Sequence, residues 1–264
     1  MVIKPQFQHY IGIDYSGAQT PTSSLPGLRV YAADHRSPAK EVLPPPSPRK
    51  YWTRKGLAEW LRDELNKPKP VVVGIDHAFS FPLQYFEAHG LPLDWSKFLD
   101  DFQRHWPTDE DNTSVDFVRE GECGNGRNRM GDPSWFRLTD LWTPSAKSVF
   151  RFDVQGQVAT STHAGLPWLR YLRTHCREHV HFWPFDGCEI PHGRSVVAEV
   201  YPSLWTRRFA NDGERNADQH AAYAAASWLR RADANGSLQR FFNPALESQE
   251  RTIAQVEGWI LGVV

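Results

Sequence analysis

Two aspartates occur in the same short sequence context. Asp14 and Asp76 each end the tripeptide Gly-Ile-Asp, and each tripeptide belongs to a run of apolar residues rich in Ile or Val. Such a run predicts a strand that is buried on both faces. Open α/β sheets bind their ligands outside the carboxyl ends of such strands. The repeat therefore predicts that Asp14 and Asp76 share one metal or phosphate site.

Two further acids could be brought to this site. Glu199 lies at the end of another Val-rich run, and Asp218 begins an Ala-rich stretch that predicts a strong helix. Mg²⁺ prefers carboxylate oxygens, and two such ions about 4 Å apart can stabilise both oxygens of a cleaved phosphodiester. Alternatively, each acid is an ordinary strand-end or helix-cap residue. The predicted catalytic acids are Asp14, Asp76, Glu199 and Asp218, of which the first three are predicted to hold Mg²⁺ or Mn²⁺.

The order of elements predicts an α/β fold with a ribonuclease H-like mixed sheet flanked by helices. Residues 9–17 and 28–33 predict two antiparallel strands, because the loop between them is too short for a helical crossover. Residues 40–43 predict a short third strand that is also antiparallel. Thr53 is expected to cap a helix that crosses over to a parallel strand ending at Asp76. The later strands are expected to be parallel.

The chain is expected to form a single domain, residues 1–264, with a large insertion at about residues 83–195. No internal repeat and no linker-like segment divides it. Apolar residues at helical or alternating spacing predict the remaining elements. These are helices at 95–106, 161–174 and 218–231, strands at 179–184 and 195–201, and a last helix from residue 250.

Three motifs, in this order, resemble those of domain-of-unknown-function family 429. They are Gly-Ile-Asp-Tyr-Ser-Gly at 12–17, Gly-Ile-Asp-His-Ala-Phe-Ser-Phe-Pro at 74–82 and Ala-Glu-Val-Tyr-Pro-Ser at 198–203, followed by the Ala-rich helix. The resemblance extends from residue 10 to about residue 230. That family is described as predicted nucleases of ribonuclease H fold. The resemblance implies that Asp14, Asp76 and Glu199 are catalytic acids.

The late helix departs from that family's pattern. The family usually has an aspartate followed by alanine there, which would put the acid at position 221, where this chain has Ala221. Helix positions three apart lie on neighbouring faces, one turn further along. Asp218 and position 221 therefore cannot reach the strand ends equally well. The resemblance implies a site of three carboxylates with weak metal affinity, to which Asp218 is at most a distant or water-mediated contributor.

Residues 119–147 are rich in Gly, Asn and Arg and are expected to be irregular. Long irregular segments are often functional loops. The planar guanidinium of arginine suits phosphate oxygens, whereas the alternative is a solvated surface loop. The predicted substrate-phosphate contacts are Arg127, Arg129, Arg137 and Lys147.

The composition limits the partners. A formal net charge of −1 gives no strong global basic footprint, so nucleic acid is a partner only through a local basic patch. No apolar run is long enough to span a membrane, so no membrane partner is expected. The first residues lack a signal-peptide pattern, which predicts a cytoplasmic location. The oligomeric state is not determined by the sequence.

The cysteines and histidines give no standard motif. Three cysteines without a Cys-x-x-Cys pair do not predict a disulfide framework. A group of His and Cys side chains between residues 175 and 192 has short spacings of the kind that zinc uses, but it matches no standard zinc finger. Zinc binding by this group stays open.

The expected activity is metal-dependent hydrolysis of phosphodiester bonds in nucleic acid. Asp14 and Asp76 would hold the metal, and Glu199 would complete the ligand set or orient the attacking water. A nucleotide-dependent phosphotransferase of the actin and sugar-kinase type also opens with Gly-Ile-Asp. It needs a second Gly-rich phosphate loop, which the segment after Asp76 lacks. A non-catalytic scaffold of the same fold is a third interpretation, motivated by Ala221.

Overall fold

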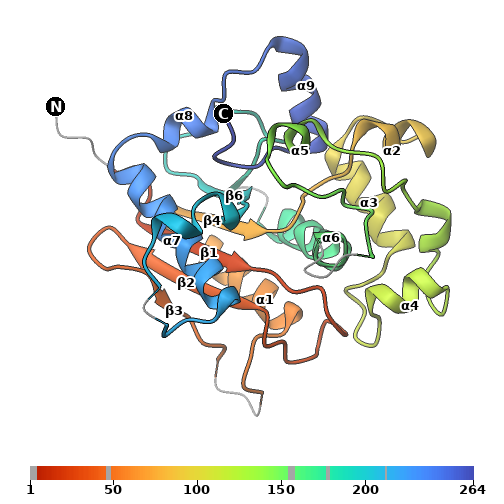
Figure 1. Ribbon diagram of the computed structural model, residues 1–264, viewed down its shortest axis with the longest axis horizontal. Coiled ribbons are helices and arrows are strands. Elements are labelled where there is room, and N and C mark those ends of the chain that lie inside the picture. The colour runs from red at the N-terminus through yellow and green to blue at the C-terminus, as the bar shows by residue number, and fades with distance from the viewer. Residues whose placement is uncertain (1–4, 46–48, 154–157, 177–178, 212) are drawn as a thin grey trace.

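A mixed sheet of six described strands lies at the centre of the fold (Figure 1). The computed structural model describes residues 5–45, 49–153, 158–176, 179–211 and 213–264. The strand order across the sheet is β3-β2-β1-β4-β6-β5. The strands are β1 His9–Asp14, β2 Arg29–Asp34, β3 Lys40–Glu41, β4 Val71–Asp76, β5 Val180–Trp183 and β6 Ser195–Glu199.

The sheet changes from antiparallel to parallel pairing at β1. β1 pairs antiparallel with β2, and β2 with β3, whereas the β1–β4, β4–β6 and β5–β6 pairs are parallel. The predicted α/β class and this mixed pairing are confirmed. Four strands are shorter than predicted: β1 ends at Asp14, β3 at Glu41 and β6 at Glu199, and β5 is one residue shorter at each end. β1 stops early because the carbonyl groups that follow it bind a buried side chain instead of a strand.

Helix α1 (Arg54–Leu65) connects the antiparallel part of the sheet to β4. Thr53 caps this helix as predicted, because its side chain accepts a hydrogen bond from the backbone N–H of Gly56 at 3.0 Å. Leu57, Leu61 and Leu65 are buried on one face of the helix. This apolar face covers the sheet while the chain crosses over to a parallel strand.

Alternate residues of the central strands enter two separate hydrophobic cores. Ile11 and Ile13 pack in one core with leucines of α1 and of α6 (Val158–His175). Tyr10 and Val72 pack in the other core with Leu229 of α7 (Ala217–Ala234). Figure 1 shows α7 on the viewer's side of the sheet and α1 on the far side. The two-residue period of a strand thus supplies apolar side chains to both layers of helices.

The segment between β4 and α6 packs beyond the carboxyl ends of β1 and β4 (Figure 1). The helix predicted at 95–106 is confirmed as α3, whereas residues 119–147 are less irregular than expected. Phe81 anchors the segment, with ring centroids 5.2 Å from Phe98 and 5.5 Å from Phe102. The elements are α2 (Leu83–Ala88), α3 (Trp95–His105), α4 (Val115–Glu120), the 3₁₀ helix η1 (Gly126–Arg129) and α5 (Leu138–Trp142).

The predicted last helix is confirmed, but it ends at Glu257. Gly258 adopts a φ of 82°, a conformation that glycine tolerates and that stops the helix. None of the described helices is both long and apolar enough to cross a membrane. The elements that follow β6, apart from α7, are η2 (Pro202–Leu204), η3 (Thr206–Arg208), α8 (Leu238–Phe242) and α9 (Ser248–Glu257).

Candidate active site at the strand ends

Asp14 and Asp76 lie side by side at the carboxyl ends of β1 and β4. They are direct partners in the parallel register of the two strands. Their carboxyl groups share a hydrogen bond, and both residues are partly exposed. The structure thus brings together the two aspartates of the repeated tripeptide, which we call the carboxylate pair.

Proximity and burial raise the pKa of both aspartates. Burial and the charges of Asp76 and Asp218 raise the pKa of Asp14 well above its usual range. Burial and the charge of Glu199 raise the pKa of Asp76 to about 7. Two adjacent carboxylates repel each other when both are ionised, so the pair keeps a proton near neutral pH unless a cation replaces it. These groups therefore suit a hard divalent cation.

The glycine of each Gly-Ile-Asp allows close packing near the aspartate. A Cβ atom on Gly12 would lie 2.3 Å from the carbonyl oxygen of Ala222 in α7. A Cβ atom on Gly74 would lie 2.6 Å from Cγ1 of Val200. Neither distance is tolerable, so only glycine permits these approaches. Packing thus explains the glycine of each tripeptide, and the chemistry of the site explains the aspartate.

A buried arginine fixes the turn that follows Asp14. Arg54, the first residue of α1, is fully buried. Its guanidinium donates hydrogen bonds to the backbone carbonyl groups of Ser16 at 3.3 Å, Ala18 at 2.6 Å and Gln19 at 2.9 Å. Sequence reasoning missed this residue, because carbonyl partners leave no signature in a sequence. Arg54 supports the loop beside the carboxylate pair.

Asp218, in the first turn of α7, faces the same site. Ala222, one helical turn further along, contacts Gly12 of β1, so Asp218 lies on the face of α7 that covers this strand. Its charge contributes to the raised pKa of Asp14. An acid is therefore present near Asp14 although Ala221 is not one.

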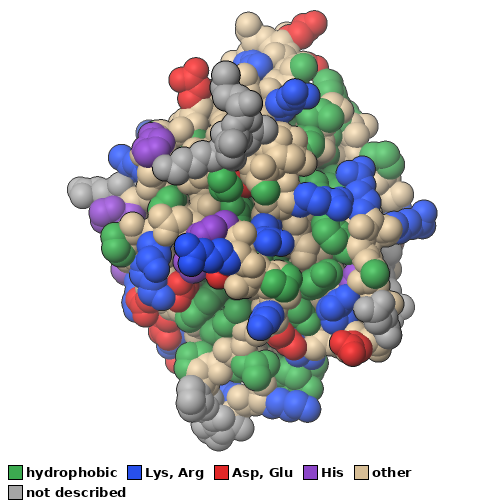
Figure 2. Space-filling view, turned by 90° about the vertical axis from the view of Figure 1, so that its left-hand side faces the viewer, with side chains coloured by type: hydrophobic (Ala, Val, Ile, Leu, Met, Phe, Trp, Pro, Cys, Tyr) green, Lys and Arg blue, Asp and Glu red, His purple; other side chains and the backbone are tan. Residues whose placement is uncertain are grey.

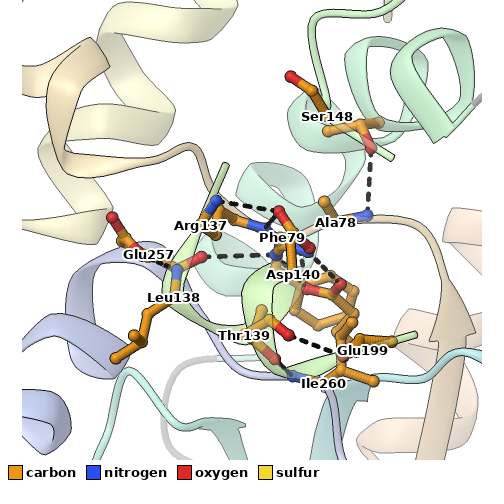
Figure 3. A network of polar contacts seen from close by, with 12 residues as sticks. Ala78, Phe79, Arg137, Leu138, Thr139, Asp140, Ser148, Glu199, Glu257 and Ile260 are labelled. Atoms are coloured by element: carbon orange, nitrogen blue, oxygen red, sulfur yellow. Dashed lines mark hydrogen bonds and ion pairs between the residues drawn. The ribbon is translucent and has the colours of Figure 1, made fainter. Parts of the chain in front are cut away.

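Glu199, at the end of β6, is held by a buried arginine (Figure 3). Arg137 Nη2 and Nη1 donate to Oε1 and Oε2 of Glu199, both at 2.7 Å. The same guanidinium donates two bonds to Asp140, at 2.8 and 3.1 Å. Glu257 joins through its backbone carbonyl, and we call these four residues the arginine network. The predicted metal ligand Glu199 thus already has a cation, which distinguishes it from the carboxylate pair.

The four predicted phosphate contacts lie in different environments. Arg137 is 1% exposed, and its donors are bound to protein acceptors, so the prediction that it contacts substrate is corrected. Arg129 pairs with Asp101 at 2.7 Å, and Arg127 donates to backbone carbonyl groups of α4. Lys147 is exposed and has no ion-pair partner in the described part of the chain. Of these side chains, Lys147 and Arg127 are exposed, and Lys147 is the one without a side-chain hydrogen bond or ion pair within the described residues.

A cavity of about 230 Å³ opens beside Asp76. Lys147 and Arg151 line it and carry positive charge. Among the described residues, the ion pair of Arg151 is an exposed, 3.4 Å contact with Asp153. Ser145, also on its wall, has a φ of 68°, which is uncommon for a residue with a side chain and is often found at functional sites. The cavity thus brings two cations next to the carboxylate pair, where an anionic group would fit.

The described residues form no complete metal cage. Among them, no group of three or more His, Cys, Asp or Glu side chains is placed to hold a metal ion. In the His and Cys group between residues 175 and 192, Cys176 is buried, and Nε2 of His181 lies 2.8 Å from the carbonyl oxygen of Gly187. A Mg²⁺ site needs fewer protein ligands than such a group, because one or two carboxylates, water and a substrate phosphate commonly complete the coordination shell of the ion.

Comparison with known proteins places this chain in no family. No family model matches it, and no curated protein or solved structure matches it either. Its function must therefore be inferred from the geometry of the site itself.

Proposed function

We propose that this protein is a metal-dependent hydrolase of phosphodiester bonds. The observation that carries the proposal is the carboxylate pair, two aspartates that share a hydrogen bond at the strand ends. Such a pair fits a hard divalent cation, because its second negative charge needs either a proton or a metal. Asp14 and Asp76 would hold Mg²⁺ or Mn²⁺, with Asp218 beside Asp14. When bound, the metal would activate water and stabilise negative charge on the phosphate.

The cavity beside Asp76 supports a phosphate-containing substrate. Lys147 would bind a phosphate oxygen as a mobile point charge, and the fork of Arg151 would bind two oxygens at once. A cavity of about 230 Å³ lies below the usual range for drug-sized ligands, roughly 300–1,000 Å³. It therefore suits one phosphoester with its sugar better than a base pair. We propose a single-stranded nucleic acid or a small phosphodiester as substrate.

The charges on the surface agree with a substrate that is bound locally. Figure 2 shows Lys and Arg side chains spread among hydrophobic ones on the face that it presents, without a continuous basic surface. Tight, sequence-independent binding of duplex DNA needs many phosphate contacts. A net charge of −1 supports the same view.

We also propose that the sheet is of the ribonuclease H-like type and that the chain is a member of family 429. Three antiparallel strands followed by parallel ones support the fold. The three sequence motifs support the family. Both proposals agree with acids at the ends of β1 and β4.

The phosphotransferase alternative is less favoured. That class needs an exposed Gly-rich loop after its second aspartate to hold nucleotide phosphates. Here residues 77–81 follow Asp76, contain no glycine and are at most 2% exposed. The non-catalytic scaffold is also less favoured. It is motivated by the missing acid at Ala221, but Asp218 supplies an acid on α7.

A hydrolysis assay tests the proposed function. The purified chain is incubated with Mn²⁺ or Mg²⁺ and with single-stranded DNA, duplex DNA, RNA, bis-p-nitrophenyl phosphate or ATP. We expect metal-dependent cleavage of at least one diester, and loss of most of this activity in Asp14→Asn and Asp76→Asn. Asp63→Asn, which changes an exposed aspartate of α1, is the matched control.

Equal turnover by the parent and both site variants would contradict the proposal. Transfer of the ATP γ-phosphate without cleavage of any diester would favour the phosphotransferase instead.

A further inference from the structure

Arg137 has no hydrogen-bond donor left for any other partner. A guanidinium has five N–H donors. Nε donates to Asp140, Nη2 to Asp140 and Glu199, and Nη1 to Glu199 and to the carbonyl oxygen of Glu257 at 3.5 Å. Arg137 is 1% exposed. Its role therefore lies inside the protein, although it comes from the segment that was expected to contact substrate.

Both carboxylate oxygens of Glu199 are correspondingly engaged. Both of its oxygens accept a 2.7 Å bond from Arg137, and Oε2 also accepts the backbone N–H of Phe79 at 3.2 Å (Figure 3). Charge-assisted, bidentate bonds of this kind are among the strongest that proteins form. A metal ion at Glu199 would have to displace the guanidinium or lie against it. The second case brings two positive charges together in a poorly solvated interior, where they repel strongly.

The cation is nevertheless attracted to the neighbouring strand end. One guanidinium compensates two carboxylates in the arginine network, so the network keeps net negative charge. β6 lies next to β4, and Glu199 is the register partner of Ile75, one residue before Asp76. This charge favours a cation at the carboxylate pair, which forms no ion pair with a basic side chain among the described residues. Arg29 lowers the pKa of Asp14, but this is the smallest of the effects on Asp14, and the Arg29 side chain is paired with Glu41.

We propose that the site is a one-cation centre, in which the guanidinium of Arg137 occupies the place at Glu199 that a second metal ion would otherwise take. The inference rests on the proposed function, because it requires a divalent cation at Asp14 and Asp76. Arg137 is then a positioning residue. It holds Glu199 in place and, through Asp140 and Glu257, ties α5 and the end of α9 to the sheet.

Mn²⁺ titration of the full chain tests this inference. Calorimetry gives the number of bound ions, and electron paramagnetic resonance distinguishes an isolated Mn²⁺ from a coupled pair. We expect one isolated Mn²⁺ per chain. Two ions per chain would overturn the one-cation inference but leave the proposed function intact. No binding at all would overturn both.

Two sets of variants test the part played by Arg137. In Arg137→Gln combined with Asp140→Asn, Glu199 loses its cation while the neighbouring charges stay balanced. We expect a second Mn²⁺ to bind to this folded variant, whereas Arg137→Lys keeps a positive charge and should bind only one. If the double variant folds and still binds one ion, the inference fails.

If the double variant does not fold, Glu199→Gln is compared with Asp76→Asn in the parent background. We expect Asp76→Asn to weaken Mn²⁺ binding by roughly tenfold or more, because a charged ligand is lost. Glu199→Gln should weaken it clearly less. Equal losses in the two variants would show that Glu199 is a metal ligand and would overturn the inference. Thermal unfolding confirms that each variant is folded.

Discussion

Two groups of acids lie within a few strands of each other, and they are compensated in opposite ways. In the arginine network, Glu199 and Asp140 are buried, and both are ion-paired with Arg137. In the carboxylate pair, Asp14 and Asp76 form no ion pair with a cation in the described part of the chain and remain partly exposed. Protein structures usually satisfy their buried charges, so a network that is complete indicates a structural role. A pair of adjacent carboxylates that forms no ion pair with a cation within the described residues supports the proposed metal site.

The largest expected effect is on the arginine network. Arg137→Ala leaves two buried carboxylates without a cation, which should lower the free energy of unfolding by about 3–5 kcal/mol. Urea denaturation at neutral pH measures this loss. The control is Arg119→Ala, because Arg119 forms a partly exposed pair with Asp116, whose loss should cost about 0–1 kcal/mol. Equal losses for the two variants would break the distinction between the network and a surface pair.

A smaller effect of opposite sign is expected at the carboxylate pair. The pKa of Asp76 is about 7 in the folded protein and near 3.8 in the unfolded chain. The folded state therefore binds more protons between these values, and stability falls as the pH rises through this window. Asp76→Asn removes this pH-dependent loss of stability. Without metal, it should raise the free energy of unfolding at pH 8 by on the order of 1 kcal/mol, or about 2–4 °C in Tm, because partial exposure screens the repulsion.

The pH dependence is the control for this prediction. At pH 4 the stabilisation by Asp76→Asn should disappear, because Asp76 is then protonated in the folded parent. Mn²⁺ should raise the Tm of the parent at pH 8 and should have little effect on the variant. A variant that is less stable than the metal-free parent at pH 8 would show that Asp76 is already compensated within the protein.

The smallest effect on stability is expected at Lys147, which is exposed. Lys147→Ala should change the free energy of unfolding by less than about 0.5 kcal/mol. It should nevertheless weaken inhibition by inorganic phosphate roughly tenfold, because a charge-assisted bond to a phosphate oxygen is lost. Inhibition constants of the parent, Lys147→Ala and the exposed control Lys97→Ala test this. Unchanged inhibition in Lys147→Ala would show that Lys147 does not bind phosphate in the cavity.

Much of the fold follows from local patterns in the sequence. The apolar runs before Asp14 and Asp76 identify β1 and β4, and the short loop after residue 17 requires an antiparallel partner. Thr53 identifies the start of α1. These features depend on residues that are neighbours in the chain. The approach of Asp14 to Asp76 could also be predicted, because two neighbouring parallel strands end at one edge of the sheet.

The roles of Arg137 and Asp218 could not be predicted in this way. Arg137 lies 62 residues from Glu199, in a segment whose many arginines are equivalent by composition. Only the packing of α5 against α9, at the end of β6, selects one of them for burial. Likewise, the contact of Ala222 with Gly12 fixes how α7 is rotated, and this rotation turns Asp218 toward Asp14.

The sequence by itself determined which strands end in aspartate and that these ends meet, because strand period and crossover direction are local properties of the chain. The tertiary structure decided which acids keep an uncompensated charge. Compensation depends on distances between side chains that are far apart in sequence, and at close range in the interior these distances govern the energy of a charge. Asp14 and Asp76 therefore remain open to a cation. Glu199 ends a similar apolar run, but it is bound to Arg137.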